Sequence, residues 1–316
     1  MKQIEIKAYA KINLSLGVLG RRTDGYHELQ SVMQSVDLFD TVMIRKTEGE
    51  GIKLSVYDED GNPLTEEKSG IPWDERNIAV KAAVKWLKTV ALKNTPVESF
   101  VSGYEIRLTK RIPQAAGMAG GSADAAAVLY GLNKLNGELL TEEELIHVGA
   151  AIGADVPFCL KGGTCLCEGI GEILSPVPES PAWNLLLIKP DINVSTKDIF
   201  TALDSLPEYK NPDTGKLFST LSSGINTDLT YISGIIGNVL ENVTVPLHPV
   251  IAEIKAFCIE NGALGALMSG SGPTVYAFFE TPEKALFAKN TAIQKYPGFV
   301  VKTAKTCDTG LEEMTE

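Results

Sequence analysis

The stretch IPQAAGMAGGSADAAAV, residues 112–128, is built almost entirely of small side chains. It follows a strand-like segment and places Gly117, Gly120 and Gly121 just ahead of Ser122. Glycine permits a positive φ and a close approach of the backbone to a ligand, and the first turn of a helix presents unpaired N–H groups at the positive end of its dipole. The pattern therefore predicts an anion-binding loop that leads into a helix beginning at Ser122, with phosphate as the natural ligand.

The residues that follow support this helix, because an apolar residue recurs at helical spacing at Ala125, Val128, Leu129, Leu132 and Leu135. The glycine spacing differs from that of a Walker A loop, which needs Gly-Lys-Ser/Thr, and from the G-x-G-x-x-G dinucleotide motif. For the stretch taken alone, a tight packing turn between a strand and a helix is the alternative.

Composition limits the class of protein. The chain has 316 residues with 44% hydrophobic and 22% charged residues, as is typical of soluble globular proteins, and it has no apolar run long enough to span a bilayer. A formal net charge of -11 argues against a nucleic-acid or anionic-membrane binder. The first residues show no signal or transit pattern, and the five cysteines are scattered. We expect a cytoplasmic protein with small-molecule partners, no nucleic acid and no membrane, either a monomer or a homodimer.

Strict alternation of apolar and polar residues over 4–18 predicts a long strand with one buried face. The same period places Tyr9, Lys11 and Asn13 together on the opposite face. These three side chains converge on one ligand if that face lines a cleft. A solvated face is the alternative.

The remaining periodicities predict a mixture of strands and helices. Strands are expected within 31–46, 104–113 and 185–190, and helices within 75–92, 141–153 and 195–206. Residues 248–280 predict a helix, a strand, a glycine turn and a second strand, whereas 47–72 and 209–226 are predicted to be polar loops, the first with a hairpin as the alternative. A change of composition predicts two domains, an ATP-binding domain over 1–176 and a substrate-side domain over 177–316.

Two further stretches have a bearing on function. GADVPF, residues 153–158, carries Asp155 just past a predicted helix end, and SGSGPTVYAFF, residues 269–279, contains a second glycine turn. With Lys11 they form an ordered set: lysine strand, glycine loop, aspartate loop and glycine turn. This set resembles the motifs of the small-molecule kinase superfamily that includes galactokinase, homoserine kinase, mevalonate kinase and phosphomevalonate kinase.

Four stretches narrow the resemblance to the family of 4-diphosphocytidyl-2-C-methyl-D-erythritol kinases. They are AYAKINLSLGVLGRRTDGYHELQSVMQSVDLFD (8–40), IPQAAGMAGGSADAAAVLYGLNKL (112–135), IGADVPFCLKGGTCLCEGIGEIL (152–174) and LMSGSGPTVYAFF (267–279). They extend in order over nearly the whole chain, and the pair Tyr26-His27 is the specific part, because other members of the superfamily do not usually place it there.

This resemblance implies both an activity and a fold. The activity is ATP-dependent phosphorylation of the 2-hydroxyl of 4-diphosphocytidyl-2-C-methyl-D-erythritol, giving the 2-phosphate and ADP, in isoprenoid precursor biosynthesis by the non-mevalonate (methylerythritol phosphate) pathway. The fold is a two-domain α+β kinase fold. It has an N-terminal domain with a left-handed βαβ crossover, which is an exception to the usual right-handed rule, a ferredoxin-like C-terminal domain, and an active site in the cleft between them.

Lys11 and Asp155 fall on the catalytic pair of the family. The resemblance implies that Asp155 accepts the proton of the attacking hydroxyl. Lys11 would keep that carboxylate ionised and offset the negative charge that develops on the phosphoryl group. Phosphoryl transfer depends mainly on positioning and electrostatics, so these two groups are sufficient machinery.

The resemblance assigns ATP binding to the glycine-rich loop and two nearby side chains. The Ser122 hydroxyl is available to phosphate or to the Mg²⁺ that ATP brings. Ala123 stands where the family usually has a second serine, so one hydroxyl is missing while the backbone cradle is kept. Helix N-capping is an equally good interpretation of Asn77. The ATP positions are Asn77, Lys110, Pro113, Gln114, Ala115, Ala116, Gly117, Met118, Ala119, Gly120, Gly121, Ser122 and Ala123.

For the acceptor, the resemblance assigns cytosine binding to Tyr26 and His27, since an aromatic ring can stack on the base while an imidazole hydrogen-bonds its edge. Phe200 would form the second face of an aromatic sandwich, with a core position as the alternative. The other positions assigned to this substrate are Asn13, at the erythritol end, Thr196, Gly270, Ser271 and Gly272.

Three other functions stay open at this point. A different kinase of the superfamily is one, and Tyr26-His27 argues against it. A catalytically silent nucleotide sensor is the second, and the presence of both Lys11 and Asp155 argues against it. An ATP-dependent decarboxylase on the same fold is the third, and product analysis distinguishes it from a kinase.

Overall fold

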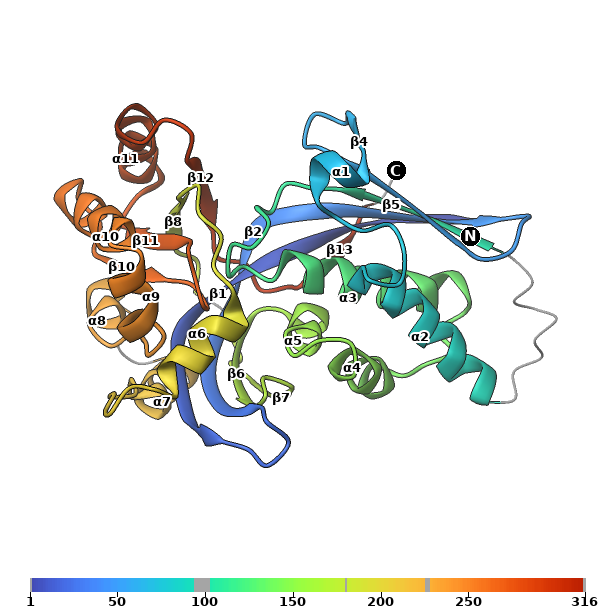
Figure 1. The fold of residues 1–316 in the computed structure, drawn as a ribbon, viewed down its shortest axis with the longest axis horizontal. Coiled ribbons are helices and arrows are strands. Elements are labelled where there is room, and N and C mark those ends of the chain that lie inside the picture. Colours follow the sequence, from blue (N-terminus) through green and yellow to red (C-terminus); the bar gives the residue numbers. More distant parts are fainter. Residues whose placement is uncertain (1, 94–102, 180, 225–227, 315–316) are drawn as a thin grey trace.

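The computed structural model describes residues 2–93, 103–179, 181–224 and 228–314. They form two halves, one built on a large sheet of long strands and the other on a small four-stranded sheet (Figure 1). In the part of the chain so described, every helix is too short or too polar to cross a membrane.

The large sheet is dominated by an antiparallel pair of long strands. Its main path runs β13-β1-β2-β5-β3-β4, with β6 beside β2, β7 beside β6 and β9 beside β1. The bounds are β1 Gln3–Arg21, β2 His27–Thr47, β3 Ile52–Tyr57, β4 Pro63–Leu64, β5 Gly103–Thr109, β6 Thr164–Gly169, β7 Ile173–Pro176, β9 Gly237–Asn238 and β13 Leu311–Glu313. The predicted strands are confirmed, except that β5 ends at Thr109, before the predicted limit at residue 113. The interval 47–72 contains the β3–β4 hairpin and the short helix α1 (Glu66–Ser69).

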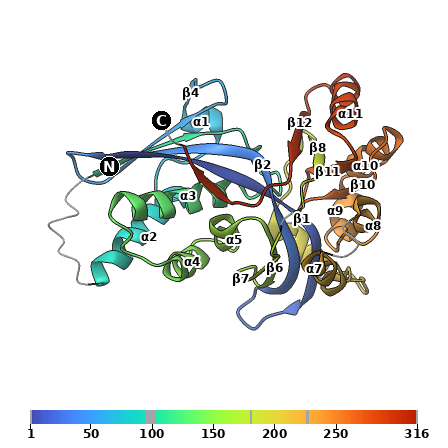
Figure 2. The ribbon, with the colours of Figure 1, turned by 180° about the vertical axis from the view of Figure 1, so that it is seen from behind.

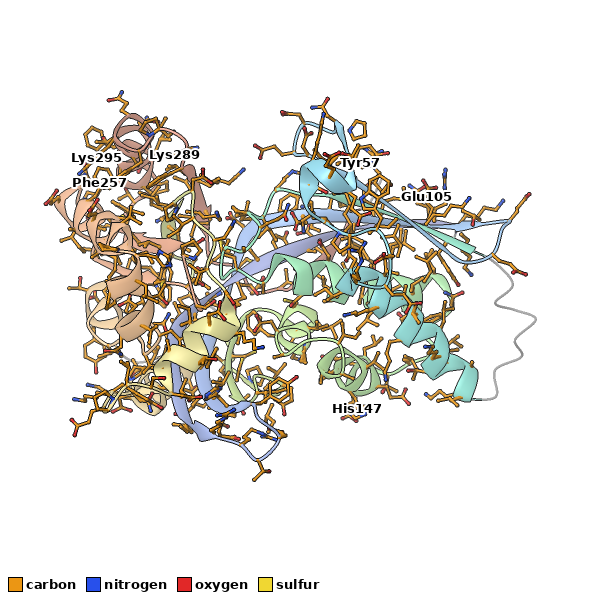
Figure 3. All side chains as sticks on the ribbon, viewed as in Figure 1. Tyr57, Glu105, His147, Phe257, Lys289 and Lys295 are labelled. Atoms are coloured by element: carbon orange, nitrogen blue, oxygen red, sulfur yellow. The ribbon has the colours of Figure 1, made fainter. Side chains whose placement is uncertain are left out.

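Four helices cover one face of this sheet: α2 (Ile78–Leu92), α3 (Gly120–Leu135), α4 (Glu142–Ala150) and α5 (Val156–Lys161) (Figure 1). Alternation along β5 explains why one face is covered, since Ile106 and Leu108 are fully buried and Glu105 is not. Figure 3 shows Tyr57 and Glu105 on the opposite side of the sheet from α2 and α3. β3 and β5 are parallel, and the chain between them passes through α2, as a βαβ unit requires.

The small sheet has the order β10-β11-β8-β12 and is antiparallel throughout. Its strands are β8 Asn184–Lys189, β10 Gly265–Met268, β11 Val275–Phe279 and β12 Val300–Lys305, and the helices packed on it are α10 Val250–Glu260 and α11 Pro282–Lys295. Numbered along the chain, the strands lie in the order 2-3-1-4, which is the ferredoxin-like arrangement that was expected. The prediction for 248–280 is confirmed.

The outer surface of this half carries cation–aromatic contacts, such as the Lys295 ammonium 5.0 Å from the centre of the Phe257 ring. Figure 3 shows these two residues and Lys289 at the far edge of the small half, well away from α6.

The helices between β8 and α10 are α6 (Thr196–Leu203), α7 (Thr214–Ser223), α8 (Leu229–Ser233) and α9 (Glu241–Leu247). The prediction of a loop over 209–226 is therefore wrong for its central part. Asp213 caps α7 by accepting from the Lys216 amide, and Leu217 and Leu221, one turn apart, are buried. Residues 225 and 226 of that predicted loop lie outside the described residues.

The C-terminal part of the chain contributes to both sheets. Strand β9 pairs in parallel with β1, and β13 pairs with the outer edge of β1, where Ala8 lies opposite Leu311. Figure 2 shows β13 returning along the large sheet after β12. The domain boundary between 1–176 and 177–316 stays a prediction. β9 and β13 both follow this boundary in the sequence, yet they pair with β1 in the large sheet.

Candidate active site

A cleft of about 920 Å³ lies where β1, the glycine-rich loop, α5 and α6 meet. The predicted catalytic and ATP-binding residues Lys11, Asp155 and Gly117 line this cleft. The predicted cytosine-binding residues His27 and Phe200 line it too. Among the predicted positions, Tyr9, Ala123 and Gly272 do not line this cleft.

The polar face of β1 is buried, so the solvated-face alternative is wrong. Lys11 is 4% exposed and Asn13 is 1% exposed. The other half of the molecule covers this face, because the Tyr276 hydroxyl of β11 donates to the Asn13 carbonyl at 2.9 Å. Alternation identified the polar side chains of Lys11 and Asn13, but it could not show that the small half packs on them. It also failed at register shifts in the β1–β2 pairing after Tyr9 and after Asn13. Tyr9 instead donates to Glu312 and lies outside the cleft, whereas Leu16, predicted on the apolar face, lines the cleft.

Lys11 and Asp155 face each other across the cleft. The Lys11 Nζ lies 3.6 Å from Asp155 Oδ2, and it donates a 2.8 Å hydrogen bond to Asn13 Oδ1. Asn13 Nδ2 in turn donates to Ser31 Oγ at 2.9 Å, and that hydroxyl donates to the Ser15 carbonyl. This chain of buried hydrogen bonds fixes the lysine, while the Asp155 side chain stays 31% exposed toward the cleft.

The Asp155 side chain lies at the start of a helix but is not used to cap it. Helix α4 ends at Ala150, three residues before the predicted stop at Gly153, although the predicted capping box of Thr141 and Glu144 is present. Asp155 then occupies the N-cap position of α5, a helix that sequence reasoning missed, and its side chain makes no capping hydrogen bond. Its carboxylate is therefore available to a ligand.

The glycine-rich loop packs directly on the second glycine turn. The Ser269 hydroxyl donates to the Gly117 carbonyl at 2.9 Å, and the Lys11 amide donates to the Met118 carbonyl at 3.1 Å. Gly117 has a φ of 71°, and a Cβ atom there would lie 2.2 Å from the Ser269 carbonyl oxygen. Gly117 therefore has a packing role, but against the second glycine turn and not between a strand and a helix, and it joins the two halves of the molecule.

Helix α3 begins at Gly120, two residues earlier than predicted. Its N-cap, Ala119, has a φ of 58° and no side-chain capping bond within the described part of the chain. Ala123, in the first turn of this helix, lies in the hydrophobic core, where it is 0% exposed. The first turn, including Ser122, opens into the cleft with uncapped N–H groups. This arrangement suits a phosphate group.

The two side chains assigned to ATP outside the glycine-rich loop, Asn77 and Lys110, have partners within the protein. Asn77 Oδ1 accepts from the Ala79 amide and Nδ2 donates to the Pro72 carbonyl, both at 2.9 Å, so the N-cap interpretation is confirmed. Lys110 Nζ binds the carboxylates of Asp40 and Asp124.

Sequence reasoning missed this buried network beside the phosphate loop. Asp40 Oδ1 accepts from the Ile112 amide at 2.9 Å, so the network ties β2 to the entry of the loop. Lys110 extends the network to Asp124 in the first turns of α3. Burial raises the pKa of Asp124 to about 7, because desolvation outweighs the stabilising charge of Lys110. No local pattern links these three residues, which lie far apart in the sequence.

At the end of the cleft predicted to bind the phosphoryl acceptor, the rings of His27 and Phe200 lie 4.8 Å apart, centre to centre, at an interplanar angle of 31°. Phe200 thus rests against the imidazole, while Tyr26 is 61% exposed at the rim of the cleft. The Thr196 and Ser271 hydroxyls are hydrogen-bonded to each other at 2.8 Å, which brings α6 and the second glycine turn together.

Two cleft residues at this end were not assigned from the sequence. His27 Nε2 lies 2.8 Å from Asp204 Oδ1, and Arg21 Nη1 lies 3.7 Å from Asp204 Oδ2. Asp204 follows Phe200 by four residues on α6, so helical spacing was the signal that could have found it.

Comparison with known proteins places this geometry in a family. Models of the GHMP kinases match residues 77–163 (N terminal domain) and 224–298 (C terminal). The 4-diphosphocytidyl-2-C-methyl-D-erythritol kinase of Clostridium perfringens (strain SM101) is 44% identical over 277 residues, which is 88% of this chain and 89% of that protein. This chain belongs to the 4-diphosphocytidyl-2-C-methyl-D-erythritol kinase family.

Two more members of this kinase family match over most of their length. The protein of the same name from Clostridioides difficile (strain 630) is 43% identical over 94% of this chain and 93% of its own. A crystal structure of 4-(cytidine 5'-diphospho)-2C-methyl-D-erythritol kinase superposes with a TM-score of 0.73 at 29% identity, covering 95% of this chain and 98% of that one. The predicted family and the two-domain kinase fold are therefore confirmed.

Proposed function

We propose that this enzyme transfers the γ-phosphoryl group of ATP to the 2-hydroxyl of 4-diphosphocytidyl-2-C-methyl-D-erythritol, giving the 2-phosphate and ADP, in the non-mevalonate pathway of isoprenoid biosynthesis. One observation carries the proposal. The Lys11–Asp155 pair lies in the same cleft as two other features: the N-terminus of α3, which has no side-chain cap and suits a phosphate group, and the neighbouring rings of His27 and Phe200.

Asp155 is the proposed general base. Its exposed carboxylate accepts the proton of the substrate 2-hydroxyl as the new O–P bond forms and the bond from the γ-phosphorus to the bridging oxygen of ADP breaks. Lys11, which is hydrogen-bonded to Asn13, places a positive charge beside both the carboxylate and the phosphoryl group that is being transferred. The fixed position of the ammonium matters, since a preorganised charge needs no rearrangement during the reaction.

The loop from Pro113 to Ser122 is the proposed phosphate cradle. The glycine at 117 fixes the loop against the second glycine turn, and the uncapped N–H groups of the first turn of α3 face the cleft. Ser122 would offer its hydroxyl to the phosphate or to Mg²⁺, which, when bound with ATP, supplies charge neutralisation on the phosphate oxygens.

We also propose that three further expectations hold. The protein acts in the cytoplasm, it binds no nucleic acid, and it is a monomer or a homodimer. Its net charge of -11 supports the second expectation, because nucleic-acid binding requires a basic surface.

The test is an acceptor competition. Purified protein is incubated with Mg-ATP and 4-diphosphocytidyl-2-C-methyl-D-erythritol, with homoserine and mevalonate as parallel acceptors, while ADP release and acceptor mass are followed. We expect an added phosphate on the cytidine substrate alone. Transfer to another acceptor would contradict the proposed cytosine end, and release of carbon dioxide from a mevalonate diphosphate would identify a decarboxylase instead.

A further inference from the structure

Asp204 links two cleft residues that no motif connects to it. It lies at the C-terminal end of α6, and its Oδ1 is 2.8 Å from His27 Nε2 while its Oδ2 is 3.7 Å from Arg21 Nη1. The His27 side chain is only 12% exposed and that of Asp204 is 32% exposed. The histidine is thus held at the cleft wall by a charged partner on one side and by the Phe200 ring on the other.

The carboxylate determines where the imidazole carries its proton. An ionised carboxylate can only accept hydrogen bonds, so the ring nitrogen that faces it must carry the hydrogen. In neutral His27 this leaves Nδ1 with a free lone pair, since a neutral imidazole has one donor and one acceptor nitrogen. Nδ1 has no hydrogen-bond partner among the residues that the structure describes. A ligand can therefore hydrogen-bond to Nδ1 only by donating a hydrogen to it.

This single acceptor distinguishes two pyrimidines. Cytosine presents an exocyclic amino donor where uracil presents a carbonyl acceptor. A site that offers an acceptor there pairs with the amino group and leaves two facing lone pairs with the carbonyl, which is the kind of mismatch that discriminates strongly.

We propose that Asp204 is a positioning residue that sets the choice of base: it holds His27 in the Nε2–H tautomer, so that Nδ1 accepts a hydrogen bond from the amino group of cytosine and disfavours uracil. This inference rests on the proposed function, because it takes the His27 end of the cleft as the base site. Arg21 has a separate part. Its guanidinium lies near Asp204 Oδ2 and partly offsets the negative charge of that carboxylate, so the ligand does not have to supply a positive charge there.

The decisive variant is Asp204→Asn. An amide keeps the shape of the side chain but can donate to Nε2, which permits the Nδ1–H tautomer and places a donor opposite the cytosine amino group. We expect KM for the cytidine substrate to rise about tenfold with kcat changed less than about twofold, since one hydrogen bond to the base is lost and the reacting groups are untouched. We expect selectivity for the cytidine over the uridine form of the substrate to fall by about the same factor.

The tautomer itself gives a second readout that a merely structural role would not move. With ¹⁵N-labelled histidine, the wild-type spectrum should show Nδ1 unprotonated and Nε2 protonated for His27, and the Asp204→Asn spectrum should show the other tautomer or a mixture. Asp204→Ala should give a mixture as well. The control is Asp198→Asn, an exposed residue on the same helix that does not line the cleft, and it should change neither readout.

Binding of CDP and UDP, measured by calorimetry, separates the inference from the proposed function. If no cytidine substrate is phosphorylated, the proposed function fails, whereas a wild-type preference for CDP over UDP that is lost in Asp204→Asn still supports the role of Asp204. An unchanged preference in folded Asp204→Asn protein would overturn the inference, and so would a wild-type His27 that is protonated on Nδ1.

Discussion

Lys11 and Asp155 form a pair in which only one member is sequestered: their charged atoms are 3.6 Å apart, yet the lysine side chain is 5% exposed and the aspartate side chain 31%. The lysine comes from the middle of β1 and the aspartate from the N-cap position of α5. The lysine charge is therefore fixed within the sheet, and the proposed proton acceptor, Asp155, lies at the surface of the cleft, where the proposed substrate hydroxyl would bind.

Replacing Asp155 with asparagine should remove the base without disturbing the ATP cradle. We expect kcat to fall by about 10²- to 10⁴-fold, the usual contribution of a general base, with the ATP dissociation constant changed less than about threefold. Turnover assays and calorimetry measure the two quantities. Asp191→Asn, at an exposed position outside the cleft, is the control and should be near wild type. Near-normal turnover in Asp155→Asn would remove this residue from the mechanism.

Gly117→Ala should weaken the junction between the two halves. A Cβ at Gly117 would meet the Ser269 carbonyl oxygen at 2.2 Å, and the φ of 71° is unfavourable for alanine in any case. Gly137→Ala isolates the second effect, because Gly137 has a φ of 84° and open space around it.

We expect Gly137→Ala to lower the free energy of unfolding by about 1 kcal/mol, the cost of a left-handed conformation, and Gly117→Ala to lower it by at least about 2 kcal/mol more. Urea denaturation gives both values. ATP affinity should fall in Gly117→Ala alone. Equal losses of stability in the two variants would show that the close contact with the Ser269 carbonyl oxygen adds nothing to the cost of the left-handed conformation.

The pKa of Asp124 predicts a specific pH dependence of stability. Burial raises this pKa from the ordinary value of 3.8 to about 7, so between these values the folded protein binds a proton that the unfolded chain does not. The resulting contribution is fully present below about pH 4 and is lost as the pH rises through 7. Across this window the stability of the wild type should fall relative to Asp124→Asn, by at most about 1.4 kcal/mol per pH unit.

Urea denaturation of both proteins from pH 4.5 to 8 measures this slope. The comparison between the two proteins matters because all other titrating groups are common to them and cancel. A difference in stability that is constant with pH would show that Lys110 keeps Asp124 ionised throughout the window.

The sequence was sufficient to predict what depends on local pattern. The capping box at Thr141 follows from side chains three residues apart, and the glycine loop follows from the backbone freedom of glycine next to a helix start. The resemblance of the motifs then predicted that Lys11 and Asp155 share a site, and the two residues do face each other.

What could not be predicted depends on long-range packing. The network of Asp40, Lys110 and Asp124 joins three separate elements, and nothing in the local sequence shows that one ammonium group serves two carboxylates. Asp204 likewise meets His27 only because α6 of the small half packs over the start of β2. Such pairs become visible once the topology is known.

Ser122→Ala tests how the proposed cradle handles the metal that accompanies ATP. Chelation of divalent cations should abolish turnover in the wild type, and Mg²⁺ should restore it, because the phosphate charge must be neutralised for transfer. If the Ser122 hydroxyl contributes to that site, the alanine variant should need about tenfold more Mg²⁺ for half-maximal rate, as expected for the loss of one polar contact to a charged group. Mg²⁺ titrations at saturating ATP measure this shift, with Ser219→Ala, at an exposed position on α7, as the control. An unchanged Mg²⁺ requirement in Ser122→Ala would mean that the backbone N–H groups hold the phosphates without the hydroxyl.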